Sequence, residues 1–293
     1  MGVDSKSKEV VTQFDLPVML ETYATSRNYE IVEPGCEEAP CFIFFSSHGI
    51  YYPNTTEEFE RSIIRANRFE WKRHAPRDGG KKIFVRDVTK QWYLNGISAE
   101  HDSVERVTGL LREQTRGRRV VCAGSSAGGY AAVLFGCLLG ASHVFSFSGQ
   151  FSLWHLLENE RDRSLNPTLT RYKNDDSLKK YFSILDLAGS SATPVFYLYP
   201  SRCAEDVLQS RLTQRVESVH AFAFDSSEHA VTCAASDYTH LFSLPLSQLL
   251  KLHDQCGDAV LSQFAFSGRV VGLHRALGRE VLAVAKRWFR SRR

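Results

Sequence analysis

Short runs of β-branched and aromatic residues recur along the chain and are separated by longer segments in which apolar residues repeat with a helical period. The longer segments include 57–73, 103–114, 127–140 and 204–216. Strands that alternate with helices form a mostly parallel sheet with helices on both faces, so the pattern predicts an α/β fold. The predicted strands are 29–32, 41–46, 82–87, 119–124, 143–148, 194–199 and 220–224.

Two regions depart from this alternation. The segment 155–190 is polar, contains Asn and Pro, and predicts an insertion or lid over one end of the sheet. Its six basic and six acidic residues balance, and it has no long apolar run. We therefore expect this segment to recognise a ligand through hydrogen bonds and not through bulk charge, and to favour a short group over a long apolar chain. From about residue 240 the pattern is helical, which predicts an α/β domain over 1–240 and a helical extension over 241–293.

Composition narrows the class of protein. A formal net charge of +3 over 293 residues gives no reason to expect nucleic-acid binding. The longest apolar runs are too short to span a membrane, and residues 1–11 lack the apolar core of a secretory signal. Seven cysteines at irregular spacing show no disulfide framework and no metal-binding pair. These features predict a cytoplasmic protein, without cofactor or metal.

The strand 119–124 leads directly into GSSAG, which fits the pattern G-x-S-x-G in one register, with Ser126 at its centre. A sharp turn from strand to helix at this serine leaves no room for side chains two residues before and two after it, which accounts for Gly124 and Gly128. The turn exposes the serine hydroxyl and brings the Ala127 N–H to a helix N-terminus, where it can stabilise an oxyanion. A phosphate-binding loop is the alternative, but the Lys-Ser/Thr ending of a P-loop is missing.

A serine nucleophile needs a histidine base and an acid that orients it, in the chain order serine, acid, histidine. Asp206 follows the strand 194–199 and His229 follows the strand 220–224, so both belong at the same sheet edge as Ser126. This convergence predicts a Ser126–His229–Asp206 triad. The alternatives for the acid are Glu205, Asp225 and Glu228.

Three other histidines fit the base less well. His143 and His220 each begin a predicted strand and so belong at the opposite edge of the sheet, and His240 begins a predicted helix.

The loop after the strand 41–46 is expected to supply the second oxyanion donor. Its small residues let the backbone approach a ligand, and Ser47 is the predicted donor. His48 lines the substrate pocket or faces solvent, and Gln150, after the strand 143–148, is a predicted substrate contact. Asp87, at the end of the strand 82–87, either binds substrate or, as we favour, fixes the loop that follows it.

Four segments together resemble the α/β-hydrolase-type proteins encoded with bacterial capsule and lipopolysaccharide genes. They are FFSSHGIYYPNTTEEFERSI (44–63), IFVRDVTKQWYLNGIS (83–98), AGSSAGGYAAVLFG (123–136) and FSFSGQFSL (145–153). The resemblance covers roughly residues 40–235 and implies an α/β-hydrolase fold and a role in building or editing surface polysaccharide. Ser126, Asp206 and His229 match its triad positions. His48 departs from it, because a small polar residue such as Asn is expected there.

The leading hypothesis is a serine esterase that removes an acyl group, most simply acetyl, from a glycan or glycan precursor. Acyl transfer to a sugar hydroxyl needs the same triad. The alternative is a non-catalytic scaffold in glycan assembly, against which the intact triad argues. The scaffold hypothesis is supported by the basic amphipathic segment 280–293, which is suited to contact with the anionic inner membrane. The other interpretation of this segment is an ordinary helix that docks on the domain.

Overall fold

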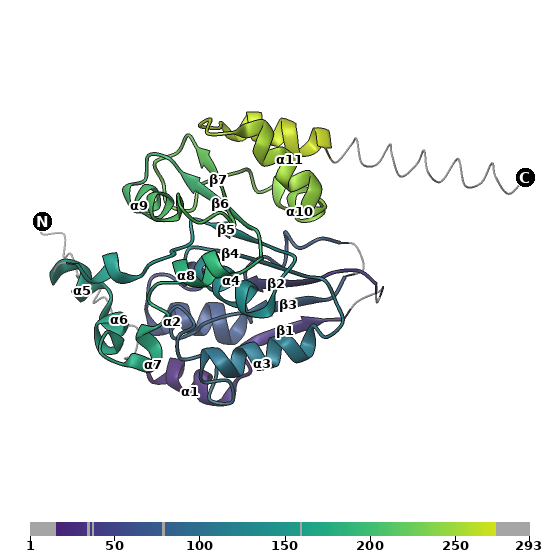
Figure 1. Cartoon of the computed structure of the whole chain (residues 1–293). Coiled ribbons are helices and arrows are strands. Elements are labelled where there is room, and N and C mark those ends of the chain that lie inside the picture. The colour runs from purple at the N-terminus through teal and green to yellow at the C-terminus, as the bar shows by residue number, and fades with distance from the viewer. Residues whose placement is uncertain (1–15, 34–35, 37, 78–79, 159, 274–293) are drawn as a thin grey trace, which may run out of the picture.

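The computed structural model describes residues 16–33, 36, 38–77, 80–158 and 160–273, and its centre is a seven-stranded sheet (Figure 1). The strand order is β1-β3-β2-β4-β5-β6-β7, and every neighbouring pair is parallel except β1 with β3. Each predicted strand is present within two residues of its expected bounds, so the mostly parallel sheet is confirmed. The strands are β1 (Tyr29–Val32), β2 (Cys41–Phe45), β3 (Lys82–Val85), β4 (Val120–Ser125), β5 (His143–Phe147), β6 (Val195–Pro200) and β7 (Val219–Phe224).

The central strands β2, β4 and β5 are buried at every position except Ser125, because both faces of the sheet are covered. In β2, Ile43 and Phe45 belong to one core, and Phe42 and Phe44 belong to the other. The first core is closed by α3 (Val104–Gln114), α4 (Ala127–Leu139) and α8 (Leu185–Ser190). These three helices cover one face of the sheet.

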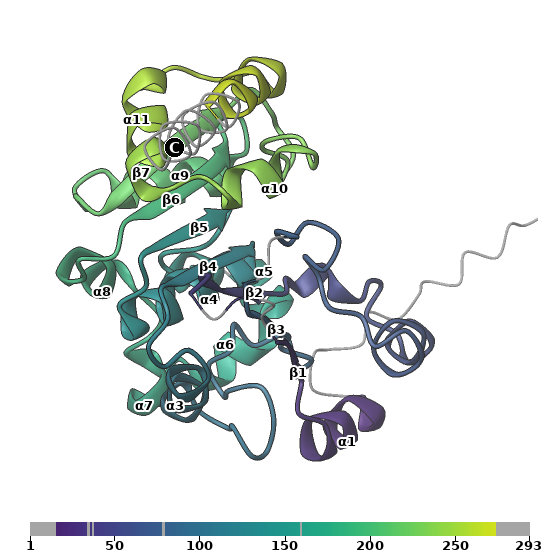
Figure 2. The ribbon, with the colours of Figure 1, turned by 90° about the vertical axis from the view of Figure 1, so that its right-hand side faces the viewer.

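The second face is covered by the C-terminal helices, which lie above β5–β7 in Figure 2. They are α10 (Asp237–Phe242), α11 (Leu246–Cys256) and a helix over 263–273. Leu249, Phe266 and Val270 are fully buried in the same cluster as Phe145 of β5. The predicted helical tail is confirmed as far as residue 273, and its described part shares the core of the sheet. The basic segment 280–293 lies outside the described residues.

The region after β2 is fixed to the rest of the protein by a separate cluster. Met19 of α1 (Pro17–Thr25) packs with Ile50, Tyr51 and Phe59. Phe59 ends α2 (Thr56–Phe59), which continues as a π-helical segment, Glu60–Arg65. A 3-10 turn, His48–Ile50, begins this region directly after β2.

The insertion is present and helical. It contains a 3-10 turn (Trp154–Leu157), α5 (Glu160–Leu165), α6 (Pro167–Tyr172) and α7 (Asp176–Lys179). The Tyr130 hydroxyl of α4 donates to the Tyr181 carbonyl at 2.6 Å, and Lys180 pairs with Glu105 of α3 at 2.9 Å. These contacts dock the insertion against the helices that cover one face of the sheet. In the described part of the chain, no helix is both long and apolar enough to cross a membrane.

Candidate active site

Ser126 stands at the turn between β4 and α4 with φ 54° and ψ −123°, a conformation that residues with a side chain rarely adopt. A Cβ on residue 124 would lie 2.0 Å from the Gly128 carbonyl oxygen, and one on residue 128 would lie 2.3 Å from the Phe45 carbonyl oxygen. Both glycines are therefore required by close backbone contacts. The strand–serine–helix turn predicted from the sequence is present.

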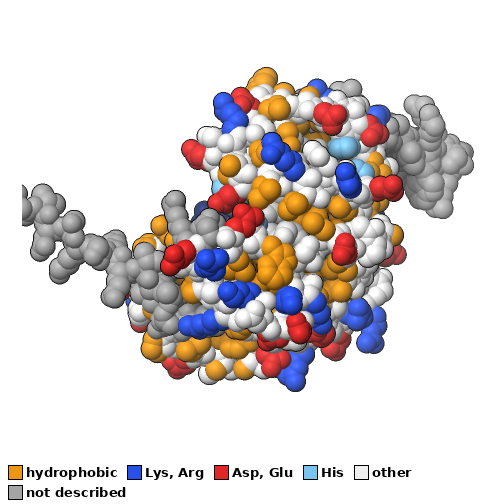
Figure 3. Space-filling model, turned by 60° about the vertical axis from the view of Figure 1, so that its left-hand side comes forward, with side chains coloured by type: hydrophobic (Ala, Val, Ile, Leu, Met, Phe, Trp, Pro, Cys, Tyr) orange, Lys and Arg blue, Asp and Glu red, His pale blue; other side chains and the backbone are white. Residues whose placement is uncertain are grey.

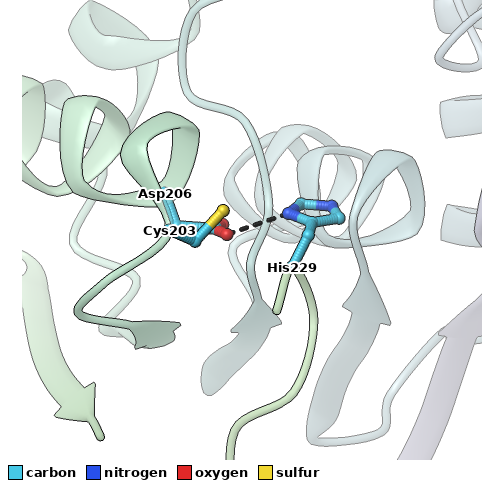
Figure 4. Close-up of side chains that lie close together, drawn as sticks. All are labelled: Cys203, Asp206 and His229. Carbon is cyan, nitrogen blue, oxygen red and sulfur yellow. Dashed lines mark hydrogen bonds and ion pairs between the residues drawn. The ribbon is translucent and has the colours of Figure 1, made fainter. Parts of the chain in front are cut away.

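A hydrogen-bonded chain joins the three predicted triad residues. The Ser126 hydroxyl lies 2.9 Å from His229 Nε2, and His229 Nδ1 lies 2.9 Å from Asp206 Oδ2. Asp206 is in the first turn of α9 (Ala204–Thr213), and Figure 4 shows its carboxylate facing the imidazole, which comes from the loop after β7. The structure thus brings together groups from three strand ends in the order that proton transfer from a serine requires.

Asp206 and His229 differ in exposure, and the environment of His229 shifts its pKa. The Asp206 side chain is 2% exposed, and that of His229 is 34% exposed. Burial lowers the pKa of His229, but the hydrogen bond that its ring N–H donates to Asp206 and the charges of Asp206 and Glu205 outweigh it, so the pKa is raised overall. An imidazolium formed when His229 takes a proton is therefore stabilised in place.

The three alternative acids named from the sequence do not share the hydrogen bond that Asp206 forms with His229. Asp225 pairs with Arg202 at 3.0 Å, and Glu228 is exposed. Glu205 acts on His229 only through its charge.

Two residues that sequence reasoning missed support the pair. The Ser148 hydroxyl accepts a hydrogen bond of 3.1 Å from the Ala230 N–H and so holds the loop that carries His229. Cys203 precedes α9, and burial raises the pKa of its thiol, helped by a hydrogen bond to Asp206. Within the described ranges, Cys203, Asp206 and His229 form a group whose ligand atoms lie within 4.8 Å of one another, close enough to hold a metal ion (Figure 4).

The first predicted oxyanion donor has a suitable position. Ala127 is the first residue of α4, so no carbonyl lies one helical turn earlier to accept its N–H. The positive end of the helix dipole adds to the attraction for an anion. The second predicted donor is engaged: the Ser47 N–H donates to Glu70 Oε2 at 2.7 Å. Ser47 as an oxyanion donor stays a prediction that requires the Glu70 carboxylate to move.

His48 and Gln150, the predicted substrate contacts, both lie against Trp92. The His48 ring centroid is 4.4 Å from that of Trp92, whose Nε1 is 3.4 Å from Gln150 Oε1. Burial holds the pKa of His48 well below its ordinary value, and the buried Nε2 has no hydrogen-bond partner among the described residues. The low pKa favours the neutral ring, and its Nε2 is covered by protein atoms in this conformation.

Asp87 has the role that the sequence favoured. Its buried carboxylate accepts hydrogen bonds from the backbone N–H groups of Thr89, Gln91 and Tyr93 at 2.6–3.0 Å, and from the Thr89 hydroxyl. These bonds hold the loop in which Lys90, Trp92 and Tyr93 have positive φ. Asp87 thus fixes the position of Trp92 rather than facing a substrate.

A cavity of about 760 Å³ lies beside the turn that carries Ser126. Ser125 and Ser47 line it, and the segment 66–74 forms much of its wall. No described residue of 155–190 lines it, so the expectation that the insertion covers the pocket and sets its charge is not met at this cavity. The helical contacts with α3 and α4 explain the difference, because they dock the insertion beside the sheet.

No protein-family model matches the chain, and no curated protein matches its sequence. Among solved structures, it is similar to the capsule O-acetyltransferase of Neisseria meningitidis serogroup A, with 11% identity, a TM-score of 0.50, and coverage of 76% of this chain and 97% of that one. The chain has the α/β-hydrolase fold. Esterase B from Lactobacillus rhamnosis is another similar structure, with 12% identity, a TM-score of 0.46, and coverage of 81% of this chain and 90% of that one. At these identities the likeness shows the fold alone.

Proposed function

We propose that the protein is a serine esterase or acyltransferase that acts on an acyl-modified glycan or glycan precursor. The observation that carries the proposal is the continuous chain from the Ser126 hydroxyl through His229 to Asp206, with 2.9 Å at each step. Nothing in a purely structural turn requires a strained serine hydrogen-bonded to a histidine whose other nitrogen meets a buried carboxylate.

In the proposed reaction, the Ser126 oxygen attacks the carbonyl carbon of the ester while His229 Nε2 accepts the hydroxyl proton. The Ala127 N–H stabilises the tetrahedral oxyanion, and the Ser47 N–H joins it once Glu70 has moved away. The C–O bond of the leaving alcohol then breaks, and His229 returns the proton to that alcohol. Water, or a sugar hydroxyl in the transferase, attacks the acyl-enzyme by the same route.

The glycan part of the proposal has two supports. The four segments named above resemble capsule- and lipopolysaccharide-linked proteins, and the capsule O-acetyltransferase of N. meningitidis has the same fold. We also propose that the Gln150 amide and, after a local movement that uncovers Nε2, the His48 ring contact the substrate, because both are polar groups that lie against Trp92. We also propose a cytoplasmic location, with contact to the inner membrane through 280–293.

The proposal is tested with nitrophenyl esters of different acyl length. We expect hydrolysis of the acetate in preference to the octanoate, and loss of nearly all turnover in His229→Ala, by several orders of magnitude in kcat. Ser125→Ala is the matched control and should keep the activity. A preference for octanoate would exclude the acetyl substrate, and full activity in His229→Ala would exclude the triad mechanism.

A further inference from the structure

The cavity beside Ser126 has an unbalanced set of charges. Four cationic side chains line it, against one carboxylate; they are Arg61, Arg68, Lys72 and Arg73, and the carboxylate is Glu70. On the face that Figure 3 shows, by contrast, basic and acidic side chains are mixed among hydrophobic ones. The excess of positive charge is therefore a local property of this cavity and not of the whole chain, whose net charge is +3.

Two of the four cations already have carboxylate partners outside the wall of the cavity. Arg61 forms a 2.8 Å ion pair with Glu58, one turn earlier. Lys72 forms a 2.7 Å ion pair with Glu30 of β1. These two side chains are held in place by their partners and offer little net charge to a ligand.

Arg68 and Arg73 are different. Both side chains are exposed, and neither forms a hydrogen bond or ion pair with another described residue. The Glu70 carboxylate accepts hydrogen bonds from the Ser47 N–H at 2.7 Å and the Ser47 hydroxyl at 3.1 Å, and it interacts with Arg68 through charge without forming an ion pair. One carboxylate offsets only part of the charge of two guanidinium groups, so the cavity keeps a positive excess. Two unpaired guanidinium groups thus line a cavity that also reaches the residue next to the nucleophile.

Resting on the proposed function, we infer that this cavity binds an anionic glycan, whose carboxylate or phosphate group is held by Arg68 and Arg73 while its ester reaches Ser126. A guanidinium presents parallel N–H donors in a plane, a geometry that matches both carboxylate and phosphate oxygens. Tyr238, which also lines the cavity, offers an aromatic surface for the sugar ring. This recognition by charge replaces the expectation from the insertion, whose residues do not line the cavity.

The test compares kcat/KM at low ionic strength for three acetylated sugars: a methyl glucoside, a glucuronate and a glucose 1-phosphate. We expect at least one anionic sugar to be preferred over the neutral one by about tenfold or more, and the preference to fall as salt is added. In Arg68→Gln/Arg73→Gln the ratio should fall toward one. Arg65→Gln is the matched control, because Arg65 is a nearby exposed arginine, at the end of the π-helical segment, that lines a separate cavity, and it should keep the ratio.

The values of kcat/KM for the glucuronate and the sugar phosphate show whether the cavity prefers a carboxylate or a phosphate group. Equal kcat/KM for all three sugars in an enzyme that depends on Ser126 would overturn the inference and leave the proposed function standing. A preference for anions that survives the double substitution would also overturn it. Absence of Ser126-dependent turnover of every ester would instead overturn the proposed function itself.

Discussion

At the scale of single residues, the site depends on a balance between burial and charge at His229. Burial favours the neutral imidazole, and the Asp206 carboxylate at 2.9 Å favours the protonated one, with the carboxylate prevailing. The same contact fixes the ring so that Nε2 faces the Ser126 hydroxyl. Asp206 is thus a positioning residue that also sets the pH range in which His229 can accept a proton.

A pH profile tests this balance. Since the base must be neutral to accept a proton, a raised His229 pKa means that kcat/KM is lost as pH falls through a value above the ordinary histidine pKa. Asp206→Asn removes the carboxylate charge that raises the His229 pKa, and burial, which lowers it, then prevails. The midpoint of this acidic limb should therefore move to lower pH, while kcat falls by a large factor. Asp225→Asn, which breaks only an exposed ion pair, should leave the limb unchanged. An acidic limb that shifts in Asp225→Asn and not in Asp206→Asn would assign the acid to Asp225.

The triad could be predicted from the sequence because each member follows the end of a parallel strand, and such ends meet at one edge. The contact of Glu70 with Ser47 could not be predicted, because Glu70 lies in a segment of irregular backbone 23 residues further along the chain. Cys203 and Ser148 act through contacts to neighbouring loops, which no periodicity in the sequence reports.

At the scale of elements, the turn from β4 to α4 requires close contacts between backbone segments, within the turn and with the end of β2. A methyl group at residue 128 would lie 2.3 Å from the Phe45 carbonyl oxygen, and backbone cannot move aside as a flexible side chain would. Since Phe45 ends β2, the packing of α4 on β2 fixes where Ser126 points. This requirement was visible in the sequence as the spacing of Gly124 and Gly128, whereas the partner atoms were not.

We expect Gly128→Ala to lower the free energy of unfolding by about 1–3 kcal/mol, as overpacking does, and to reduce activity by displacing Ser126. Gly109→Ala, within α3, is the matched control because nothing lies within 4 Å of its added Cβ. It should raise the free energy of unfolding by about 0.5–1 kcal/mol. Denaturation in urea measures both variants, and equal stability of the two would contradict the close approach of α4 to β2.

At the scale of the whole molecule, the C-terminal helices close one of the two cores. The sequence indicated their helical period and placed them in an extension, because local patterns do not show which face of a sheet lacks a cover. In the structure, Leu249 and Phe266 pack with Phe145 and Phe222 of the sheet. The fold therefore depends on the described part of the region 241–273, and the α/β alternation alone does not provide both cores.

Two phenylalanines in the helix 263–273 test this dependence. Phe266 is fully buried and Phe264 is 90% exposed. Phe266→Ala should lower the free energy of unfolding by about 3–5 kcal/mol, whereas Phe264→Ala should change it by less than about 0.5 kcal/mol. The measurement is again denaturation in urea. A small effect of Phe266→Ala would show that the tail folds apart from the sheet.

The central claim is that Ser126 is an activated nucleophile, and covalent labelling with a fluorophosphonate followed by peptide mass spectrometry tests it most directly. A fluorophosphonate reacts with serines whose proton is removed by a neighbouring base. We predict a single modified site, Ser126, in the wild type and in Ser125→Ala, and no modification in Ser126→Ala. Labelling that persists in Ser126→Ala, or that falls on Ser125 in the wild type, would contradict the account.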